Sequence, residues 1–280
     1  MINKISIVTI NKNNAVGLEK TIKSVISQKK DFFEFIVIDG NSIDNSKDLL
    51  LSYKSGITYS ISEPDTGIYN AMNKGILNAS GDFILFLNSG DFLVDDNVIE
   101  DVCKQITLND EIVSGTIIIE DEFNKQHKVD SQEKINIQHF INLSLYHQAT
   151  FISKKLFDNY GLYNESFKIG GDYEFFIRLF YKNNCMYRRI TRKIAYFKSD
   201  GISNDSTHIQ KKSIESRKAW ELNVSNRTLE IFNDYDKITR SNTFWLYQKT
   251  LKSKIYNAFF QILLVSRSRT AKFVKSIFKS

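Results

Sequence analysis

Three aspartates carry side chains that could do chemistry, and each also has a plain structural interpretation. Asp39 follows the apolar run 33–38, and its carboxylate could accept hydrogen bonds from a nucleobase. A turn aspartate in a Gly-Asn-Ser loop is the alternative. Asp91 follows the apolar run 83–87 and could bind a divalent cation, because hard cations take carboxylate oxygens. It could equally be a loop residue ahead of the next helix.

Asp172, the third aspartate, follows two glycines and precedes an apolar helical pattern. A carboxylate there could act as the general base that deprotonates a hydroxyl nucleophile. It could also cap the helix, with Glu174 adding a second negative charge to the first turn. Asn73 and Lys74 lie on a predicted helix after Gly67, where a solvated helix surface is the alternative to a ligand contact. By themselves these residues fit either a ligand site or ordinary structure.

The stretches between these residues predict the elements that position them. Apolar runs of strand length alternate with segments of helical periodicity, which is typical of an α/β fold with a doubly wound, mostly parallel sheet. The predicted strands are 5–10, 33–38, 59–61 and 83–87. Polar residues follow each strand, at Asn11, Asp39, 63–65 and 88–91. Right-handed crossovers bring these strand ends to one edge of the sheet, where such folds bind ligands.

The second half of the chain predicts more strands and a helical end. A helix over 95–106 and a strand over 112–119 precede the polar stretch 120–136, which we interpret as a hairpin or a loop. Strands are expected in 147–153, 185–190 and 195–198, a helix begins near Asp172, and the pattern is helical from about 207. We therefore expect a domain over 1–205, with halves 1–92 and 93–205, followed by a helical extension over 206–280.

The net charge of +6 belongs to the C-terminal tail. Residues 237–280 hold ten of the 38 Lys and Arg residues and no acid, which leaves 28 basic and 32 acidic residues in 1–236. An acidic main domain disfavours nucleic acid as a partner. The tail interleaves aromatic residues with lysines, so we expect it to dock on an anionic membrane surface. A helical pair packed on the main domain is the alternative.

Several features point to a cytoplasmic location. The two cysteines lie far apart and form no metal-type cluster, as is common in reducing compartments. The first ten residues turn polar too soon for a signal peptide. The sequence has no run of about 18 apolar residues, the length that a spanning helix needs. We expect a protein that is peripheral on the inner face of the cytoplasmic membrane, and oligomers are possible.

The order of these features resembles the family 2 glycosyltransferases with the GT-A fold. Asp39 is followed by D-x-G-x-x-x-A-x-N-x-G at 65–75, then by Asp91, and then by the distant G-D-x-E at 171–174. The segment 64–75 is similar to the PDxGIYxAMNKG of bacterial members that act in capsule, exopolysaccharide or O-antigen assembly. The resemblance covers roughly residues 3–205.

The resemblance implies an inverting glycosyltransferase. It would move a sugar from a nucleotide-diphosphate sugar, with UDP expected, to a lipid-linked or growing glycan. The half 1–92 would bind the nucleotide sugar and the half 93–205 the acceptor. Asp172 would be the base, and Asp91 would bind Mg²⁺ or Mn²⁺. The implied donor-binding residues are Thr9, Asn11, Asp39, Asp65, Asn73, Lys74 and Asn88. The residues implied beside the acceptor and diphosphate are His147, Gln148, Glu174, Ser203 and His208.

Departures from the family's pattern bear on the metal. The family's metal motif holds two or three acids, whereas the segment 88–91 holds only Asp91. Gly40 stands where many relatives carry a second aspartate, and Met72 stands where an arginine is expected, so a phosphate contact would pass to Lys74. A single carboxylate binds Mg²⁺ weakly unless phosphates share it. The thinned motif supports a second hypothesis, a non-catalytic, membrane-associated nucleotide-sugar-binding subunit of a polysaccharide assembly complex. A dehydrogenase is disfavoured because no G-x-G-x-x-G follows the first strand.

Overall fold

The computed structural model describes residues 4–121, 123–135, 140, 144–198, 209–230, 234 and 237. The chain forms two compact units, Met1–Val224 and Ser225–Ser280. The first unit contains the sheet and the helices discussed below. Within the described ranges, no helix has the length and apolar character that crossing a membrane requires.

The first four long strands form the parallel half of the sheet, as predicted. They are β1 (Ile5–Asn11), β2 (Phe33–Asp39), β3 (Tyr59–Ser62) and β4 (Phe83–Phe86), in the order β3-β2-β1-β4. The connecting helices are α1 (Ala15–Ile26), α2 (Ser46–Ser52) and α3 (Ile68–Leu77), with short 3-10 turns η1 (Lys30–Phe32) and η2 (Lys54–Gly56). Asn14 begins α1 because its side-chain oxygen accepts from the Gly17 amide.

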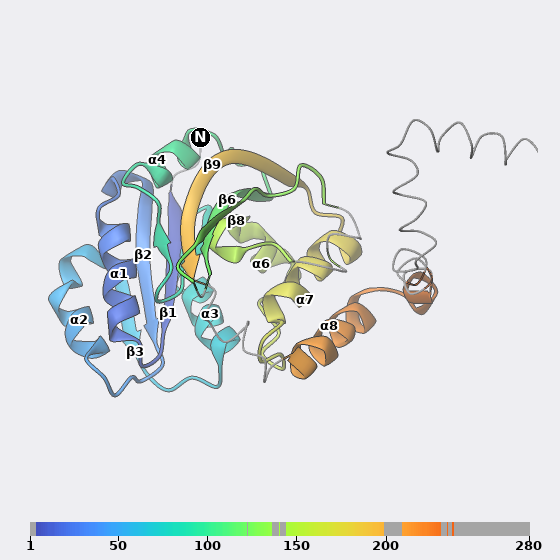
Figure 1. The fold of residues 1–280 in the computed structure, drawn as a ribbon, viewed down its shortest axis with the longest axis horizontal. Helices are drawn as coiled ribbons and strands as arrows, with labels where there is room; N and C mark the ends of the chain where they lie inside the picture. The colour runs from blue at the N-terminus through green and yellow to red at the C-terminus, as the bar shows by residue number, and fades with distance from the viewer. Residues whose placement is uncertain are drawn as a thin grey trace, which may run out of the picture. The chain divides into compact units, whose positions relative to one another are not determined.

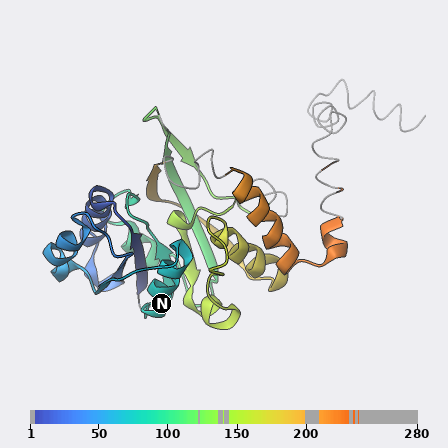
Figure 2. The same ribbon diagram turned by 90° about the horizontal axis from the view of Figure 1, so that it is seen from below.

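The second half of the sheet is mixed. Strand β8 (Thr150–Ser153) runs antiparallel between β4 and β6 (Ile112–Glu120), and β9 (Tyr187–Lys198) lies parallel to β6. The short β5 (Phe92–Leu93) pairs with β9, and β7 (Gln126–Val129) forms a hairpin with β6. Figure 2 shows this hairpin extending beyond the rest of the sheet. The polar stretch 120–136 thus contains a hairpin strand, which is one of the two predicted interpretations.

Two predicted boundaries differ from the observed ones. The strands expected at 185–190 and 195–198 are a single strand, β9. Of the polar residues between them, Thr191 and Lys193 are exposed on one face, whereas Arg192 on the other face pairs with Asp95 and Asp101. The helix expected over 95–106 is shorter, with α4 limited to Val98–Cys103. Neither difference moves the strand ends at which ligands were expected.

Apolar side chains cover both faces of the sheet. Ile7 and Leu85 belong to a cluster on the α1 and α4 side, whereas Val8 and Phe86 belong to a cluster on the α3 and α7 side. Figure 1 shows α1 and α2 on one side of the parallel strands and α3 on the other. Burial on both faces explains why β1, β2 and β4 are apolar along most of their length.

The second apolar cluster supports the later helices. These are α6 (Lys154–Tyr160), α7 (Gly171–Ile177), which continues as a π-helical turn η4 (Arg178–Lys182), and α8 (Ile209–Asn223). The 3-10 turn η3 (His147–Ala149) precedes β8, and its Ala149 belongs to the first cluster. Ala219 of α8 is fully buried in the same cluster as Phe175 and Phe176 of α7. The compact unit therefore runs to Val224 and includes α8, whereas the sequence placed a boundary at 205.

Candidate functional site

The polar residues at the strand ends meet at one edge of the sheet. Asn11 and Asp39 are directly opposite each other in the β1–β2 pair, and the Asn11 amide donates to Asp39 Oδ1 at 2.7 Å. Ser89 comes from the loop after β4, and its hydroxyl donates to Asn11 Oδ1 at 2.8 Å. The sequence prediction that the ends of β1, β2 and β4 converge is confirmed.

Asp39 is fully buried at this edge and bonded on both oxygens. It accepts from Asn11, from the Ser42 amide at 2.9 Å and hydroxyl at 2.6 Å, and from the Ser62 hydroxyl at 2.5 Å. Burial alone would raise the pKa of Asp39, but these hydrogen bonds outweigh burial and the pKa is lowered. Thr9 is also fully buried, and its hydroxyl donates to the Leu87 carbonyl at 2.6 Å. The side chains of Asp39 and Thr9 are therefore bonded to other parts of the protein at this edge and do not face outward.

Asp65 lies above the end of β2. A Cβ atom at Gly40 would come within 2.1 Å of Asp65 Oδ2, so this close approach requires a glycine. The Asp65 carboxylate accepts from the Gly67 amide at 3.1 Å and lies 3.7 Å from the Lys12 ammonium. The absence of a side chain at position 40 thus makes room for the carboxylate of Asp65.

The predicted donor residues of α3 make contacts within the protein. Asn73 is buried and bonds both backbone groups of Tyr163, accepting from its amide at 3.0 Å and donating to its carbonyl at 2.9 Å. Lys74 pairs with Glu63 at 2.7 Å and donates to the Pro64 carbonyl at 2.9 Å. Asn73 therefore ties α3 to the loop that leads toward α7, and Lys74 braces the loop before α3.

Asp172 lies at the start of α7 and is joined to two other segments. Its Oδ2 is 3.4 Å from His147 Nδ1, and its Oδ1 is 3.0 Å from the Tyr69 hydroxyl, which also donates to the Ile169 carbonyl at 2.5 Å. The side chains of Asp172 and His147 are 20% and 18% exposed, so solvent reaches both. Burial would raise the pKa of Asp172, but the hydrogen bond and charge of His147 and the Tyr69 hydroxyl outweigh it, and the pKa is lowered.

The hydrogen bonds continue from His147 to the end of β4. The Asn88 amide nitrogen lies 3.2 Å from His147 Nε2. Burial and the Asp172 charge raise the pKa of Tyr69 well above its ordinary value, so its hydroxyl stays a donor. Asp172 is thus an ionised, partly exposed carboxylate held by donors from two sides.

Comparison with known proteins identifies the family. Residues 6–170 match the sequence model of Glycosyl transferase family 2. The chain belongs to this family. It is 33% identical over 177 residues to an uncharacterized glycosyltransferase of Mycobacterium tuberculosis, which covers 62% of this chain and 68% of the relative.

Solved structures share the fold. A crystal structure of S. aureus TarS 1–349 in complex with UDP-GlcNAc has a TM-score of 0.64 at 17% identity, covering 90% of this chain and 76% of that one. The mannosyltransferase PcManGT from Pyrobaculum calidifontis, in complex with GDP-Man and Mn2+, has a TM-score of 0.57 at 9% identity, covering 89% of this chain and 84% of that one. The predicted GT-A-type fold and glycosyltransferase class are confirmed.

In this family 2 glycosyltransferase, Glu215 holds the loop before α7 in place, and the sequence did not predict this role. Glu215 of α8 is buried and accepts three successive backbone amides, from Lys168 at 2.8 Å, Ile169 at 2.9 Å and Gly170 at 2.8 Å. A Cβ atom at the next residue, Gly171, would lie 2.7 Å from the Tyr69 ring. No sequence signal distinguished Glu215 from the other charged residues of α8. Tyr69 was recognisable only as a residue one turn before Asn73.

The residues predicted to lie beside the acceptor and diphosphate fall into three groups. His147 is part of the site, and Gln148 beside it is buried. Glu174 is buried and bonds Asn223 of α8 at 2.9 Å and Arg178 at 3.3 Å, so its carboxylate connects α7 to α8. Ser203 and His208 lie outside the described residues.

Asp91 and Asn88 follow β4 and carry oxygen atoms of the kind that a divalent metal takes as ligands. Asp91 is 6% exposed, and the backbone amide of Asp91 donates to the Asn88 carbonyl at 2.9 Å. The side-chain oxygen of Asn88 is buried and has no hydrogen-bond partner. Among the residues that the structure describes, no group of three His, Cys, Asp or Glu could hold a metal. These donors fit a hard cation such as Mg²⁺ that takes most of its ligands from phosphates and water.

Proposed function

We propose that this glycosyltransferase moves a sugar, with inversion, from a UDP-sugar to a hydroxyl of a lipid-linked or growing glycan in bacterial surface polysaccharide synthesis. The observation that carries the proposal is the series of contacts from Asn88 through His147 to Asp172. It supports a base at Asp172, because an ionised carboxylate stands partly open to solvent beside the ligand-binding edge of the sheet.

One base is enough for a one-step displacement. The acceptor oxygen forms its bond to the anomeric carbon while the bond from that carbon to the diphosphate oxygen breaks, and the acceptor's proton passes to Asp172. The lowered pKa keeps Asp172 ionised at neutral pH and ready to receive that proton. His147 and Tyr69 hold its two oxygens, so the carboxylate keeps one orientation as the acceptor approaches.

The donor would lie along the edge formed by β1, β2 and β4. The residues proposed to contact the donor are Asn11, Asp65, Lys74 and Asn88. The donor would not touch Thr9, Asp39 and Asn73, whose hydrogen bonds hold the surrounding loops in place. UDP is proposed because the TarS complex, which shares the fold, contains UDP-GlcNAc. Gly40 and Asp65 together support a nucleobase site, because the space beside Gly40 brings a carboxylate to the end of β2.

A divalent metal, Mg²⁺ or Mn²⁺, is proposed as cofactor. Asp91 and the side-chain oxygen of Asn88 would hold it, together with the donor's phosphates. When bound, such an ion stabilises the negative charge that grows on the leaving diphosphate. The fold neighbour PcManGT was crystallised with Mn2+, which supports the proposal at the level of the fold.

The acceptor pathway and the membrane are proposed from the sequence. The motif at 64–75 supports capsule, exopolysaccharide or O-antigen assembly, and the basic, aromatic-rich stretch 237–280 supports docking on the inner face of the cytoplasmic membrane. In a vesicle flotation assay, the full chain should bind anionic but not zwitterionic vesicles. Replacing Lys272, Lys275 and Lys279 by Gln should weaken that binding, and equal flotation of both proteins would contradict docking.

The function itself is tested by donor binding and product stereochemistry. Calorimetry with UDP, GDP and dTDP, with and without Mn²⁺, should show tightest binding of UDP with the metal present. The product formed from a UDP-α-sugar should carry a β linkage by NMR. Preferred GDP binding would contradict the proposed donor, and a retained α linkage would contradict the one-step displacement.

A further inference from the structure

A hollow lies where the chain leaves β7, and none of its lining residues belongs to the strand-end edge. It is lined by charged and polar residues, Asp130, Ser131, Gln132, Glu133, Lys134 and Arg189, and its volume is about 460 Å³. This size is within the roughly 300–1,000 Å³ of sites that bind small molecules. None of the residues described so far in the donor or base site lines it.

The floor of the hollow is fixed to the sheet. The Ser131 hydroxyl donates to a carbonyl of β6 at 2.6 Å, and the Tyr187 hydroxyl of β9 donates to the Gln132 carbonyl at 2.9 Å. Thr116 of β6 donates to Asp130 Oδ1 at 2.6 Å. These bonds hold three successive residues of the segment in place, so the hollow is preorganised before any ligand arrives.

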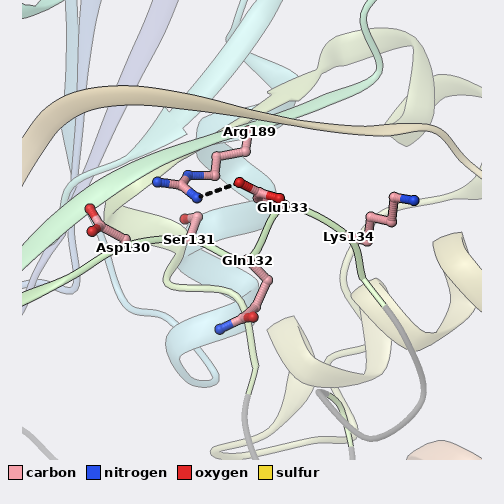
Figure 3. Close-up of a pocket in the computed structure, with 6 residues that line it drawn as sticks. All are labelled: Asp130, Ser131, Gln132, Glu133, Lys134 and Arg189. Carbon is pink, nitrogen blue, oxygen red and sulfur yellow. Dashed lines mark ion pairs between the residues drawn. The ribbon is translucent and has the colours of Figure 1, made fainter.

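Arg189 offers hydrogen-bond donors that the protein leaves incompletely used. Its Nε is buried without a hydrogen-bond partner, and its Nη1 lies 3.6 Å from Glu133 Oε1. Figure 3 shows the guanidinium lying between Asp130 and Glu133. Because the Arg189 side chain is 25% exposed while its Nε is not, a ligand oxygen in the hollow would accept from the terminal guanidinium nitrogens.

The charges of the lining residues select the kind of ligand. Two acids, Asp130 and Glu133, stand with two bases, Lys134 and Arg189, so the lining has no net charge. A phosphate would meet two carboxylates, whereas the hydroxyls of a sugar can donate to carboxylates and accept from a guanidinium. The lining also has no aromatic ring for a nucleobase to stack on. A neutral, polyhydroxylated ligand therefore fits these residues best.

The hollow is built on the strand that also borders the base site. Strand β6 pairs with β8 through Ser114 and Thr150, and His147–Ala149 leads directly into β8. Arg189, which lines the hollow, lies on β9, and Thr116, which donates to the lining residue Asp130, lies on β6 of the same half of the sheet. We propose that the hollow is a carbohydrate subsite that binds a sugar unit of the acceptor glycan away from the reacting hydroxyl. This inference rests on the proposed function, because it assumes that the acceptor is a glycan.

The test uses the full chain and a panel of methyl glycosides and disaccharides of glucose, galactose, mannose, rhamnose and N-acetylglucosamine. Saturation-transfer NMR in the presence of UDP should detect millimolar binding of at least one of them. Arg189→Gln should weaken that binding about fivefold or more, the loss expected for one hydrogen bond from a charged donor. Glu133→Gln, at an 85% exposed side chain that the fold does not need, should weaken it as well. Lys125→Gln removes a charge from the turn of the same hairpin and should change nothing.

The outcomes separate this inference from the proposed function. If no glycoside binds, or if binding is equal in all variants, the subsite is contradicted even when UDP binds normally. Inorganic phosphate is the charged probe, and its displacement of the glycoside would also contradict a neutral sugar site. If UDP itself does not bind, the proposed function fails, whatever the glycosides do.

Discussion

The hydroxyl of Tyr69 lies 3.0 Å from the carboxylate of Asp172, although the two residues are 103 positions apart in the chain. Tyr69 belongs to α3, in the half of the protein proposed to bind the donor, and Asp172 begins α7 on the acceptor side. This contact, together with His147, couples the proposed base to both halves of the site. It also gives the base a measurable signature, because both partners lower its pKa.

Tyr69→Phe should shift the pH dependence of transfer. Losing a hydrogen bond to the ionised carboxylate raises the pKa of Asp172 toward its ordinary value, so the acidic limb of kcat/KM should move to higher pH. The retained ring still packs against Gly171. Tyr163→Phe is the matched control, since the Tyr163 hydroxyl is buried without a hydrogen-bond partner. An acidic limb that Tyr69→Phe leaves in place would show that the contact does not tune the base.

Asn88→Asp should strengthen metal binding. The substitution puts a second carboxylate where a buried, unpartnered amide oxygen now lies, and carboxylates bind Mg²⁺ and Mn²⁺ better than amides do. We expect Mn²⁺ to bind about tenfold more tightly in the presence of UDP, measured by electron paramagnetic resonance. The exposed Asn97→Asp carries the same charge change and should not alter binding. Unchanged Mn²⁺ affinity in Asn88→Asp would place the metal elsewhere.

Glu215→Gln should destabilise the protein and slow transfer. A glutamine can accept fewer of the three amide bonds that fix the loop before α7, so unfolding free energy should fall by about 2 kcal/mol. Because that loop leads directly to Asp172, kcat should fall more than KM for the donor changes. The control is Glu221→Gln on the same helix, an exposed pair with Arg217 worth at most about 0.5 kcal/mol. Equal stability of the two variants would contradict the anchoring role.

Glu34 should make the free energy of unfolding fall as the pH becomes acidic. It is buried at the start of β2, and although burial alone would raise its pKa, bonds from Ser6, Ser80 and Lys4 lower the pKa to about 2. A lowered folded-state pKa contributes stability that is present above the unfolded value of 4.5 and is lost as pH falls through about 2. The contribution at neutral pH is about 3 kcal/mol. Urea unfolding should show this loss in the wild type below pH 4.5.

In Glu34→Gln, the loss of unfolding free energy between pH 4.5 and 2 that Glu34 causes should be absent. The variant should also be less stable at pH 7, because the amide cannot accept from all of the donors that bond Glu34. A variant whose stability still falls with the wild-type slope between pH 4.5 and 2 would assign the acid dependence to other carboxylates.

The sequence predicted the edge of the sheet because apolar runs determine where buried strands end. It could not predict which strand-end side chains would face a ligand. In the sequence Asp39 looks like a residue that could bind a ligand, yet its carboxylate accepts four hydrogen bonds from its own neighbours. Local pattern cannot distinguish these cases, since Ser62 reaches Asp39 only through the pairing of β3 with β2, and Asn11 only through the pairing of β1 with β2.

The same limit applies on the acceptor side. Asp172 and Glu174 are both acidic residues in the first turn of α7, but only Asp172 faces His147, whereas Glu174 points to Asn223 of α8. Helical geometry separates these two residues by about 200°, so they lie on different faces. Which face of α7 lies toward the site depends on how α8 packs against it, and the local sequence of α7 does not predict that packing. Glu215 was missed for the same reason.

The Asp172→Asn variant shows whether Asp172 removes the acceptor's proton. The variant keeps the shape of the side chain but cannot take up a proton. Transfer should fall by about 10²–10⁴-fold, while calorimetric binding of UDP stays within about twofold of wild type. Asp172→Asn protein that binds UDP and transfers sugar at the wild-type rate would contradict the account.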